Sequence, residues 1–283
     1  AFCYNEAKRW GKRGGSYITQ TSKRAVFDID GTLLTQGSHA ITPRTLKALE
    51  DLRRAGVTLI VATGRAPFAA RDALGAFEPD YLVCATGALV QDRAGKPVYA
   101  NYMTQEEMYA LVDYCEDYEL PLDFVYDEGY FAYVEYEKLK SLSTDSSAKF
   151  VIDGEDQVRH LQGLPYVACV YALPGQFDSF FEKYGHLNLR TLPFANGCGF
   201  HDVVHQNDDK ADSIEMLLKR LGLTWEQTAA FGDGLNDEKM LACAGMPVVM
   251  ENGEDSLKLP GRVVAPACKD DGVAQVIETM LLK

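Results

Sequence analysis

The chain has 283 residues, 47% of them apolar, which is enough for one large domain or two smaller ones with substantial cores. Its 28 Lys and Arg residues against 41 Asp and Glu residues give a net charge of -13, which argues against nucleic acid or anionic lipid as a partner. The apolar runs are no longer than a strand, which argues against a membrane span. The 7 cysteines are scattered and include no C-x-x-C pair, which favours a protein of the reducing cytoplasm.

The N-terminal part of the chain predicts a tail followed by a strand, a helix and a second strand. Residues 1–22 are cationic and interrupted by glycines, so we expect a loosely ordered, dispensable tail. The apolar run at 24–28 fits a buried strand. A helix is expected from Thr42, an N-cap residue followed by proline, to Gly56. The run 57–62 then fits a second buried strand, and strand, helix, strand indicates an α/β fold with a parallel sheet.

The pattern changes after a third strand at 81–85. Helices are expected near 104–119 and 176–184. Short strands follow one another in adjacent pairs, and their expected positions are 122–126, 130–134, 166–173, 187–194 and 200–204. Adjacent pairs predict an antiparallel sheet with helices on one face. We therefore interpret 87–195 as an α+β cap domain inserted into the first domain.

Beyond the insertion the pattern of a parallel sheet resumes. The elements expected there are a helix at 209–221, strands at 228–232, 247–250 and 262–265, and a helix at 272–282. The chain is thus predicted to contain the tail, a core domain formed by 23–86 and 196–283, and the inserted cap.

Reactive side chains occur where predicted parallel strands end or where a helix begins. The carboxyl ends of strands in an open α/β sheet meet at one edge, so these side chains are expected to converge there. They are Asp28, Asp30, Thr63, Lys210, Asp233 and Asp237.

Such a cluster suits the transfer of a phosphoryl group. Asp28, Asp30 and Asp233 would crowd three negative charges into one place, which needs a counter-charge. A hard divalent cation such as Mg²⁺ prefers oxygen ligands of this kind. Lys210 and Thr63 would complete a site for a dianionic phosphoryl group. Asp28, the last residue of its strand, is expected to attack phosphorus, and Asp30 to act as general acid and then general base.

In its motifs the chain resembles the haloacid dehalogenase superfamily, and within it the Cof-type sugar-phosphate phosphatases with a type IIB cap. The motifs are "DIDGT", "ATGR", "DDKADSI" and "GDGLND", in that order, and the resemblance covers residues 24–283. It implies a doubly wound, Rossmann-like core with Asp28 as nucleophile and Asp30 as acid/base. Thr86-Gly87 stands where these relatives usually carry Asn-Gly.

The resemblance also implies a set of ligands. Mg²⁺ would be held by Asp28, the backbone carbonyl of Asp30 and Asp233, with Asp237 supporting the metal site. The residues implied for phosphate binding are Thr63, Gly64 and Lys210, with Asn236 close by. Polar residues near the last cap strands are expected to select the substrate, and these are Arg190, Asn196, His201 and Asp202.

The predicted function is therefore Mg²⁺-dependent hydrolysis of a small phosphorylated metabolite, such as a sugar phosphate, through an aspartyl-phosphate. Two alternatives stay open. A phosphomutase resembling the phosphomannomutases would use the same aspartates but return phosphate to a sugar. A non-catalytic sensor of phosphoryl ligands would keep the fold without turnover. The sequence leaves the oligomeric state open.

Overall fold

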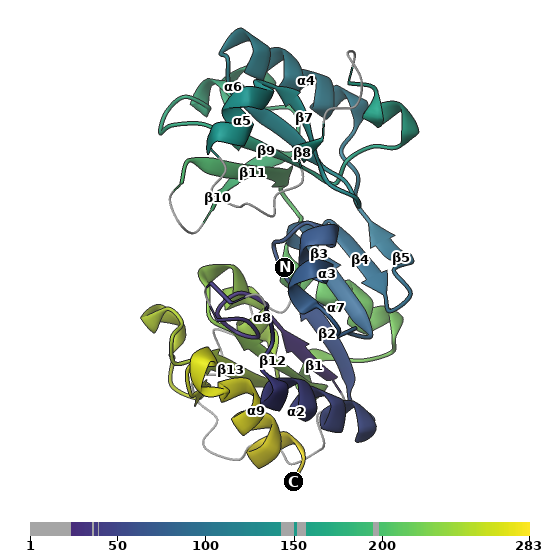
Figure 1. Cartoon of the computed structure of the whole chain (residues 1–283), viewed down its shortest axis with the longest axis vertical. Coiled ribbons are helices and arrows are strands. Elements are labelled where there is room, and N and C mark those ends of the chain that lie inside the picture. The colour runs from purple at the N-terminus through teal and green to yellow at the C-terminus, as the bar shows by residue number, and fades with distance from the viewer. Residues whose placement is uncertain (1–23, 36, 39, 143–149, 152–156, 195–197) are drawn as a thin grey trace. The chain divides into compact units, whose positions relative to one another are not determined.

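The computed structural model describes residues 24–35, 37–38, 40–142, 150–151, 157–194 and 198–283. The predicted tail, residues 1–22, lies outside the described residues. The chain divides into two compact units, which we call the core unit and the cap unit (Figure 1). Their boundaries give Ala1–Gly64, Ala70–Val98 and Asp209–Lys283 to the core unit, and Arg65–Ala69 and Tyr99–Asp208 to the cap unit.

Eight described strands form the core sheet, in the order β14-β13-β12-β1-β2-β3-β4-β5. They are β1 (Arg24–Phe27), β2 (Thr58–Ala62), β3 (Tyr81–Cys84), β4 (Leu89–Asp92), β5 (Pro97–Ala100), β12 (Thr228–Gly232), β13 (Met246–Met250) and β14 (Val263–Ala265). Pairing is parallel from β14 to β3, and β4 adds to the edge as an antiparallel strand. The central strands are apolar and buried, as expected for a sheet covered on both faces. The predicted α/β fold with a parallel sheet is confirmed.

Helices cover the core sheet in two groups. Their bounds are α2 (Pro43–Arg54), α3 (Pro67–Leu74), α7 (Lys210–Arg220), α8 (Glu238–Cys243) and α9 (Gly272–Val276). Helices α2 and α9 pack together on one side of the strands, and α7 and α8 pack together on the other (Figure 1). The helix predicted at 272–282 ends at Val276 and continues as a π-helical turn over Ile277–Leu281. Among the described helices, none is long and apolar enough to cross a membrane.

The cap unit contains a second sheet with the strand order β10-β11-β9-β6-β7-β8. Its elements are α4 (Gln105–Asp117), β6 (Leu122–Val125), β7 (Tyr130–Val134), α5 (Tyr136–Leu142), β8 (Phe150–Val151), β9 (Val167–Tyr171), α6 (Asp178–Tyr184), β10 (Leu189–Pro193) and β11 (Phe200–His205). Neighbouring strands are antiparallel except for β7 and β8. Helices α4 and α6 pack one face of this sheet through an apolar cluster that includes Leu111, Phe124 and Phe180.

The segment between the third strand and the cap sheet differs from the expectation. β4 pairs with β3 from Tyr81↔Asp92 to Cys84↔Leu89, so this hairpin strand belongs to the core sheet. The unit boundaries accordingly lie after residues 98 and 208, whereas the sequence placed the cap at 87–195. That the cap is a domain in its own right stays a prediction.

Candidate active site

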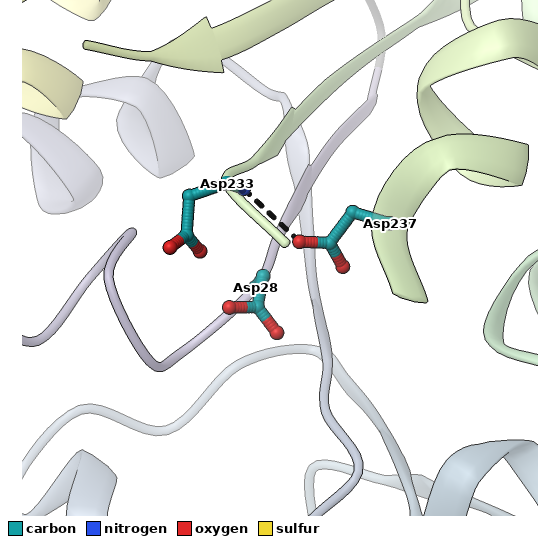
Figure 2. A group of neighbouring side chains, drawn as sticks. All are labelled: Asp28, Asp233 and Asp237. Atoms are coloured by element: carbon teal, nitrogen blue, oxygen red, sulfur yellow. Dashed lines mark hydrogen bonds between the residues drawn. The ribbon is translucent and has the colours of Figure 1, made fainter. Parts of the chain in front are cut away.

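Three carboxylates meet where two neighbouring parallel strands of the core sheet end. Asp28 follows β1 and Asp233 follows β12, and the Asp28 amide donates to the Phe231 carbonyl at 3.0 Å. Asp237 lies four residues beyond Asp233, just before α8. One ligand oxygen from each of Asp28, Asp233 and Asp237 lies within 4.8 Å of the others, and Figure 2 shows the three side chains around one point.

Lys210, the first residue of α7, reaches into this group. Its Nζ lies 2.7 Å from Asp28 Oδ1 and 2.9 Å from Asp237 Oδ1. The helix begins at an N-cap aspartate, Asp209, whose side chain accepts from the Ala211 amide and so fixes the position of Lys210. The lysine side chain is only 2% exposed, which makes it a structural counter-ion rather than a solvated lysine.

The charges of this group do not cancel. Three carboxylates and one ammonium sum to −3 + 1 = −2 when all are ionised. Burial, with Asp237 adding to it, raises the pKa of Asp28 well above its usual range despite Lys210. The same two causes raise the pKa of Asp233 to about 6. Burial lowers the pKa of Lys210, but the neighbouring carboxylates outweigh it and the net shift is upward. An all-oxygen donor set with two excess negative charges fits a hard divalent cation.

Asp237 organises the loop between β12 and α8. Its side chain is fully buried, and Oδ2 accepts from the Asp233 amide at 3.0 Å (Figure 2). The same oxygen accepts from the Gly234 amide at 3.1 Å. Its other oxygen accepts from Lys210. Asp237 therefore holds the Asp233 backbone and the lysine at the same time, which is a positioning role in addition to any contact with a metal.

The chain turns tightly after Asp28, and the turn at Gly31 lies against the Asp233 side chain. Gly31 has φ +81°, and a Cβ placed there would lie 2.0 Å from Asp233 Oδ2, so only glycine fits. Two residues to which the sequence assigned no role support the same place. Thr32 Oγ1 donates to Asp233 Oδ1 at 3.2 Å, and Asn252 Nδ2 donates to the Gly31 carbonyl at 2.8 Å. Thr32 lies inside "DIDGT", whereas Asn252 lies in "MPVVMENGED", a segment that departs from the "GVAMGNA" commoner in the family it resembles.

The remaining predicted core residues differ in their exposure to solvent. Thr63 follows β2, is buried, and donates its amide to the Val83 carbonyl at 2.9 Å. Asp30 and Asn236 are exposed, and the Asp30 charge contributes to the raised pKa of Asp233. Asp30 is thus close enough to act electrostatically on the site while its side chain stays in contact with solvent.

The loop after β3 contains strained backbone. Ala85 and Thr86 both have positive φ, 48° and 56°, and Gly87 follows at φ 100°. A Cβ on Gly64 would lie 3.7 Å from Thr86 Oγ1, so this loop adjoins the "ATGR" segment. Left-handed backbone is rare for a β-branched residue such as threonine, and strain of this kind is concentrated at functional loops.

The predicted selector residues of the cap unit do not form one group. Arg190 and Asp202 lie on the same face of the cap sheet by the β10–β11 register, and Arg190 Nη2 donates to the Asp208 carbonyl at 2.6 Å. Strand alternation places His201 on the opposite face, with Nε2 3.3 Å from the Ala172 carbonyl oxygen. Asn196 lies outside the described residues. The roles of all four stay predictions.

A family model described as haloacid dehalogenase-like hydrolase matches residues 25–277. The chain is 25% identical over 289 residues to phosphatase YwpJ of Bacillus subtilis, covering 92% of this chain and 100% of that protein. It is 30% identical over 264 residues to an HMP-PP phosphatase of Yersinia pseudotuberculosis, covering 91% and 94%. The structure of the HAD subclass IIB sugar phosphatase BT4131 shares the fold, with a TM-score of 0.70 at 23% identity over 92% of this chain and 100% of that one.

Proposed function

The chain belongs to the haloacid dehalogenase-like hydrolase family and is a phosphoric monoester hydrolase, and we propose that it acts on small phosphomonoesters through an aspartyl-phosphate formed on Asp28. The observation that carries this proposal is the Asp28 carboxylate held 2.7 Å from a buried lysine, within a group that has two excess negative charges when all its members are ionised. A carboxylate that is fixed in position and paired with a cation is suited to nucleophilic attack on phosphorus.

The proposed reaction has two steps. In the first, an Asp28 oxygen forms a bond to phosphorus while the bond from phosphorus to the ester oxygen breaks, and Asp30 donates a proton to that leaving oxygen. In the second, Asp30 accepts a proton from water as the water oxygen bonds to phosphorus and the bond to Asp28 breaks. The solvent-exposed position of Asp30 supports this role, because the group must exchange protons with leaving group and water in turn.

The other core residues are proposed to hold the phosphoryl group and the cation. Asp28 and Asp233, with the Asp30 carbonyl and support from Asp237, would hold Mg²⁺, which when bound supplies positive charge to the phosphoryl oxygens. Lys210 supplies a further fixed positive charge beside Asp28. The residues proposed to bind the phosphate are Thr63, Gly64 and Asn236. They follow the ends of core strands, which supports this role, and their side chains carry no charge.

The substrate is proposed to be a small phosphorylated metabolite of the cytoplasm. The relatives are named as phosphatases, among them enzymes for HMP-PP, and a fold neighbour is a sugar phosphatase. The acidic composition of the chain agrees with a small ligand rather than a polyanion.

The test is turnover of p-nitrophenyl phosphate by the full chain with and without Mg²⁺. We expect activity that needs Mg²⁺ and that falls by at least about 10⁴-fold in Asp28→Asn. Asp255→Asn, an exposed aspartate of the core unit, is the matched control and keeps wild-type activity. Absence of turnover in the wild type would favour a sensor, and hexose phosphate isomerised without release of phosphate would favour a mutase.

A further inference from the structure

The first turn of α7 carries Lys210 and packs against the loop that follows β3. Helix α7 contacts β3, β4 and the turn Ala85–Gly87, all of which belong to the core unit together with it. Lys210 is the first residue of the helix, and Ser213 follows it by three positions, so the two side chains project from the same turn. Whatever fixes Ser213 therefore also fixes the place from which Lys210 reaches Asp28.

A buried hydrogen bond joins this helical turn to the loop. Ser213 Oγ donates to the Gly87 carbonyl at 2.7 Å, and Ser213 is only 6% exposed. Gly87 is buried as well. Water does not compete for a hydrogen bond in such a place, so its geometry is maintained. The bond therefore fixes the distance between the loop and the start of α7.

Close contact at Gly87 restricts the same region. Gly87 has φ +100°, and a Cβ placed there would lie 2.6 Å from the Asp209 carbonyl oxygen and 3.0 Å from Ser213 Oγ. Asp209 is the N-cap residue of α7, immediately before Lys210. Only glycine combines this φ with so close an approach. The start of the helix thus rests directly on the backbone of the loop.

The other end of the loop lies beside the segment proposed to bind phosphate. Ala85 and Thr86 have φ values of 48° and 56°, and a Cβ on Gly64 would lie 3.7 Å from Thr86 Oγ1. Left-handed backbone at two successive non-glycine residues is retained only where the surroundings hold it. The loop therefore connects the Gly64 segment, at Thr86, with the helix that carries Lys210, at Gly87.

A second tie to the start of α7 comes from α8, but it is weaker. Lys239 Nζ forms an ion pair with Asp212, and another with Asp209 at 3.8 Å. The three side chains are between 27% and 34% exposed, and ion pairs in contact with solvent contribute little to holding a structure. The buried bond from Ser213 is therefore the tie that we expect to determine the position of the helix start.

We propose that Ser213 is a positioning residue for the hydrolysis and acts through Lys210. The proposal rests on the proposed phosphatase function and adds how the chain holds the lysine against the nucleophile. Lys210 Nζ lies 2.7 Å from Asp28 Oδ1 and 2.9 Å from Asp237 Oδ1, so a displacement of the helix start disturbs both contacts. The bond from Ser213 to Gly87 keeps the ammonium in place and maintains its spacing from the phosphate-binding segment.

Displacement of Lys210 is expected to slow the chemical step more than it weakens substrate binding. A fixed ammonium stabilises the transition state only where it lies close to the developing charge. A misplacement of about 1 Å can cost on the order of 10²-fold in rate. Loss of one hydrogen bond loosens the first turn but leaves the helix in place. We therefore expect a smaller loss of about 10-fold in kcat, with KM changed by less than about 3-fold.

The experiment compares Ser213→Ala with Thr228→Val, using the full chain, Mg²⁺ and p-nitrophenyl phosphate. Thr228 is a matched control because its buried hydroxyl also donates to a backbone carbonyl of the core unit, that of Thr224 at 3.1 Å. It lies at the start of β12, whereas the carboxylates lie beyond the end of that strand. We expect kcat to fall about 10-fold in Ser213→Ala and by less than about 2-fold in Thr228→Val. Equal kcat for Ser213→Ala and the wild type would overturn the proposal.

A double-mutant comparison tests whether Ser213 acts through Lys210. In the Lys210→Gln background, Ser213→Ala should lower kcat no further, because the group that Ser213 positions is absent. A loss of about 10-fold in both backgrounds would show that Ser213 affects the site by another route, which contradicts the positioning role.

Hydrogen exchange in α7 separates the failure of this proposal from a failure of the proposed function. The Ser213 amide donates to the Asp209 carbonyl at 3.1 Å, and its exchange reports on the first helical turn. Mass spectrometry of the peptide 209–220 should show faster exchange in Ser213→Ala and not in Thr228→Val. Faster exchange in a chain without turnover would reject the phosphatase proposal and still show that Ser213 holds the helix start. Unchanged exchange would reject the role of Ser213 whether or not the chain is active.

Discussion

The core and cap units both bury aspartates, but the hydrogen-bond partners of these aspartates differ. In the core unit, Asp28 and Asp237 share the buried Lys210, and Asp237 accepts two backbone amides as well. In the cap unit, Asp123 has an oxygen without any donor, and its nearest charged influence is another carboxyl, Asp202. The chain itself supplies the partners of the first group, whereas one oxygen of the second is buried without a hydrogen-bond donor.

The difference lies in which partners the chain provides. A phosphoryl group and its cation are common to all substrates of such an enzyme, so the chain can provide Lys210 and the loop amides as permanent partners. In the cap unit the described residues supply no such partner to Asp123, and burial instead raises the pKa of its carboxyl well above its usual range. The following predictions test whether the two sets of aspartates respond oppositely to mutation.

The largest effect is expected from Lys210→Gln. Removal of the ammonium leaves Asp28 and Asp237 buried without their cation, which costs about 3–5 kcal/mol of unfolding free energy. Activity should also fall by about 10²–10³-fold, as for loss of a fixed charge-stabilising group. Urea denaturation and p-nitrophenyl phosphate kinetics measure both. Lys219→Gln on the same helix removes an exposed ion pair with Glu215 and should stay within about 0.5 kcal/mol; equal effects of the two would contradict the role of Lys210.

Gly31→Ala should show the next largest effect, because its Cβ collides with Asp233. Gly37 has the same φ of +81°, but a Cβ added there would meet nothing within 4 Å, so Gly37→Ala carries the backbone penalty of about 1 kcal/mol alone. We expect Gly31→Ala to lower kcat/KM by at least about 10-fold, since Asp233 must move, while Gly37→Ala leaves it unchanged. Similar kinetics in both variants would mean that the position of Asp233 is not critical.

A pH-dependent difference is expected for Asp123 and Asp202 of the cap unit. Folding raises the pKa of Asp202 from 3.8 to about 7, so the folded state keeps a proton that the unfolded chain loses. Stability therefore falls as pH rises from about 4 to about 7, by up to about 4 kcal/mol for this group. Asp202→Asn should remove that part of the slope and be more stable than the wild type at about pH 8, in contrast to Lys210→Gln. Urea unfolding at about pH 5 and about pH 8 measures this difference in stability, with Asp113→Asn, which changes an exposed aspartate of α4, as the control. If stability changed with pH as much in Asp202→Asn as in the wild type, burial would not be the cause of the raised pKa.

The smallest effect concerns the strained loop after β3. Thr86 has φ 56° and ψ 23°, a conformation that asparagine adopts more readily than threonine. Thr86→Asn should stabilise the chain by about 1 kcal/mol, whereas Thr86→Val, which keeps the branched shape, should not. Thermal unfolding compares the two, and a lower melting temperature for Thr86→Asn would show that the hydroxyl, rather than the backbone, determines stability there.

The core site could be predicted from sequence because its residues follow strands. Asp28 and Asp233 end two apolar runs that had to be buried parallel strands, and such strands bring their carboxyl ends together whatever the separation along the chain. The helix start at Asp209 likewise placed Lys210 at the same edge. The sequence therefore predicted which residues form the cluster. It did not predict the hydrogen bonds that connect them.

Other features could not be predicted because their signal lies in three dimensions. Asp123 lies in the strand predicted at 122–126, but that its side chain is only 1% exposed cannot be read from the sequence. Asn252 supports Gly31 from 221 positions away, and nothing nearby in sequence links the two. The hairpin strand β4 is short enough that its addition to the core sheet depends on pairing with β3.

The most direct test of the proposed chemistry is rapid-quench trapping of the phosphorylated enzyme in Asp30→Asn. p-Nitrophenolate leaves without a proton, so this variant should still phosphorylate Asp28 but lack the base that activates water for the second step. We expect a burst of p-nitrophenol close to one equivalent, and borohydride reduction of the quenched protein should convert Asp28 to homoserine in the peptide mass spectrum. Conversion at another residue, or full steady-state turnover in Asp28→Asn, would contradict the assignment of Asp28 as nucleophile.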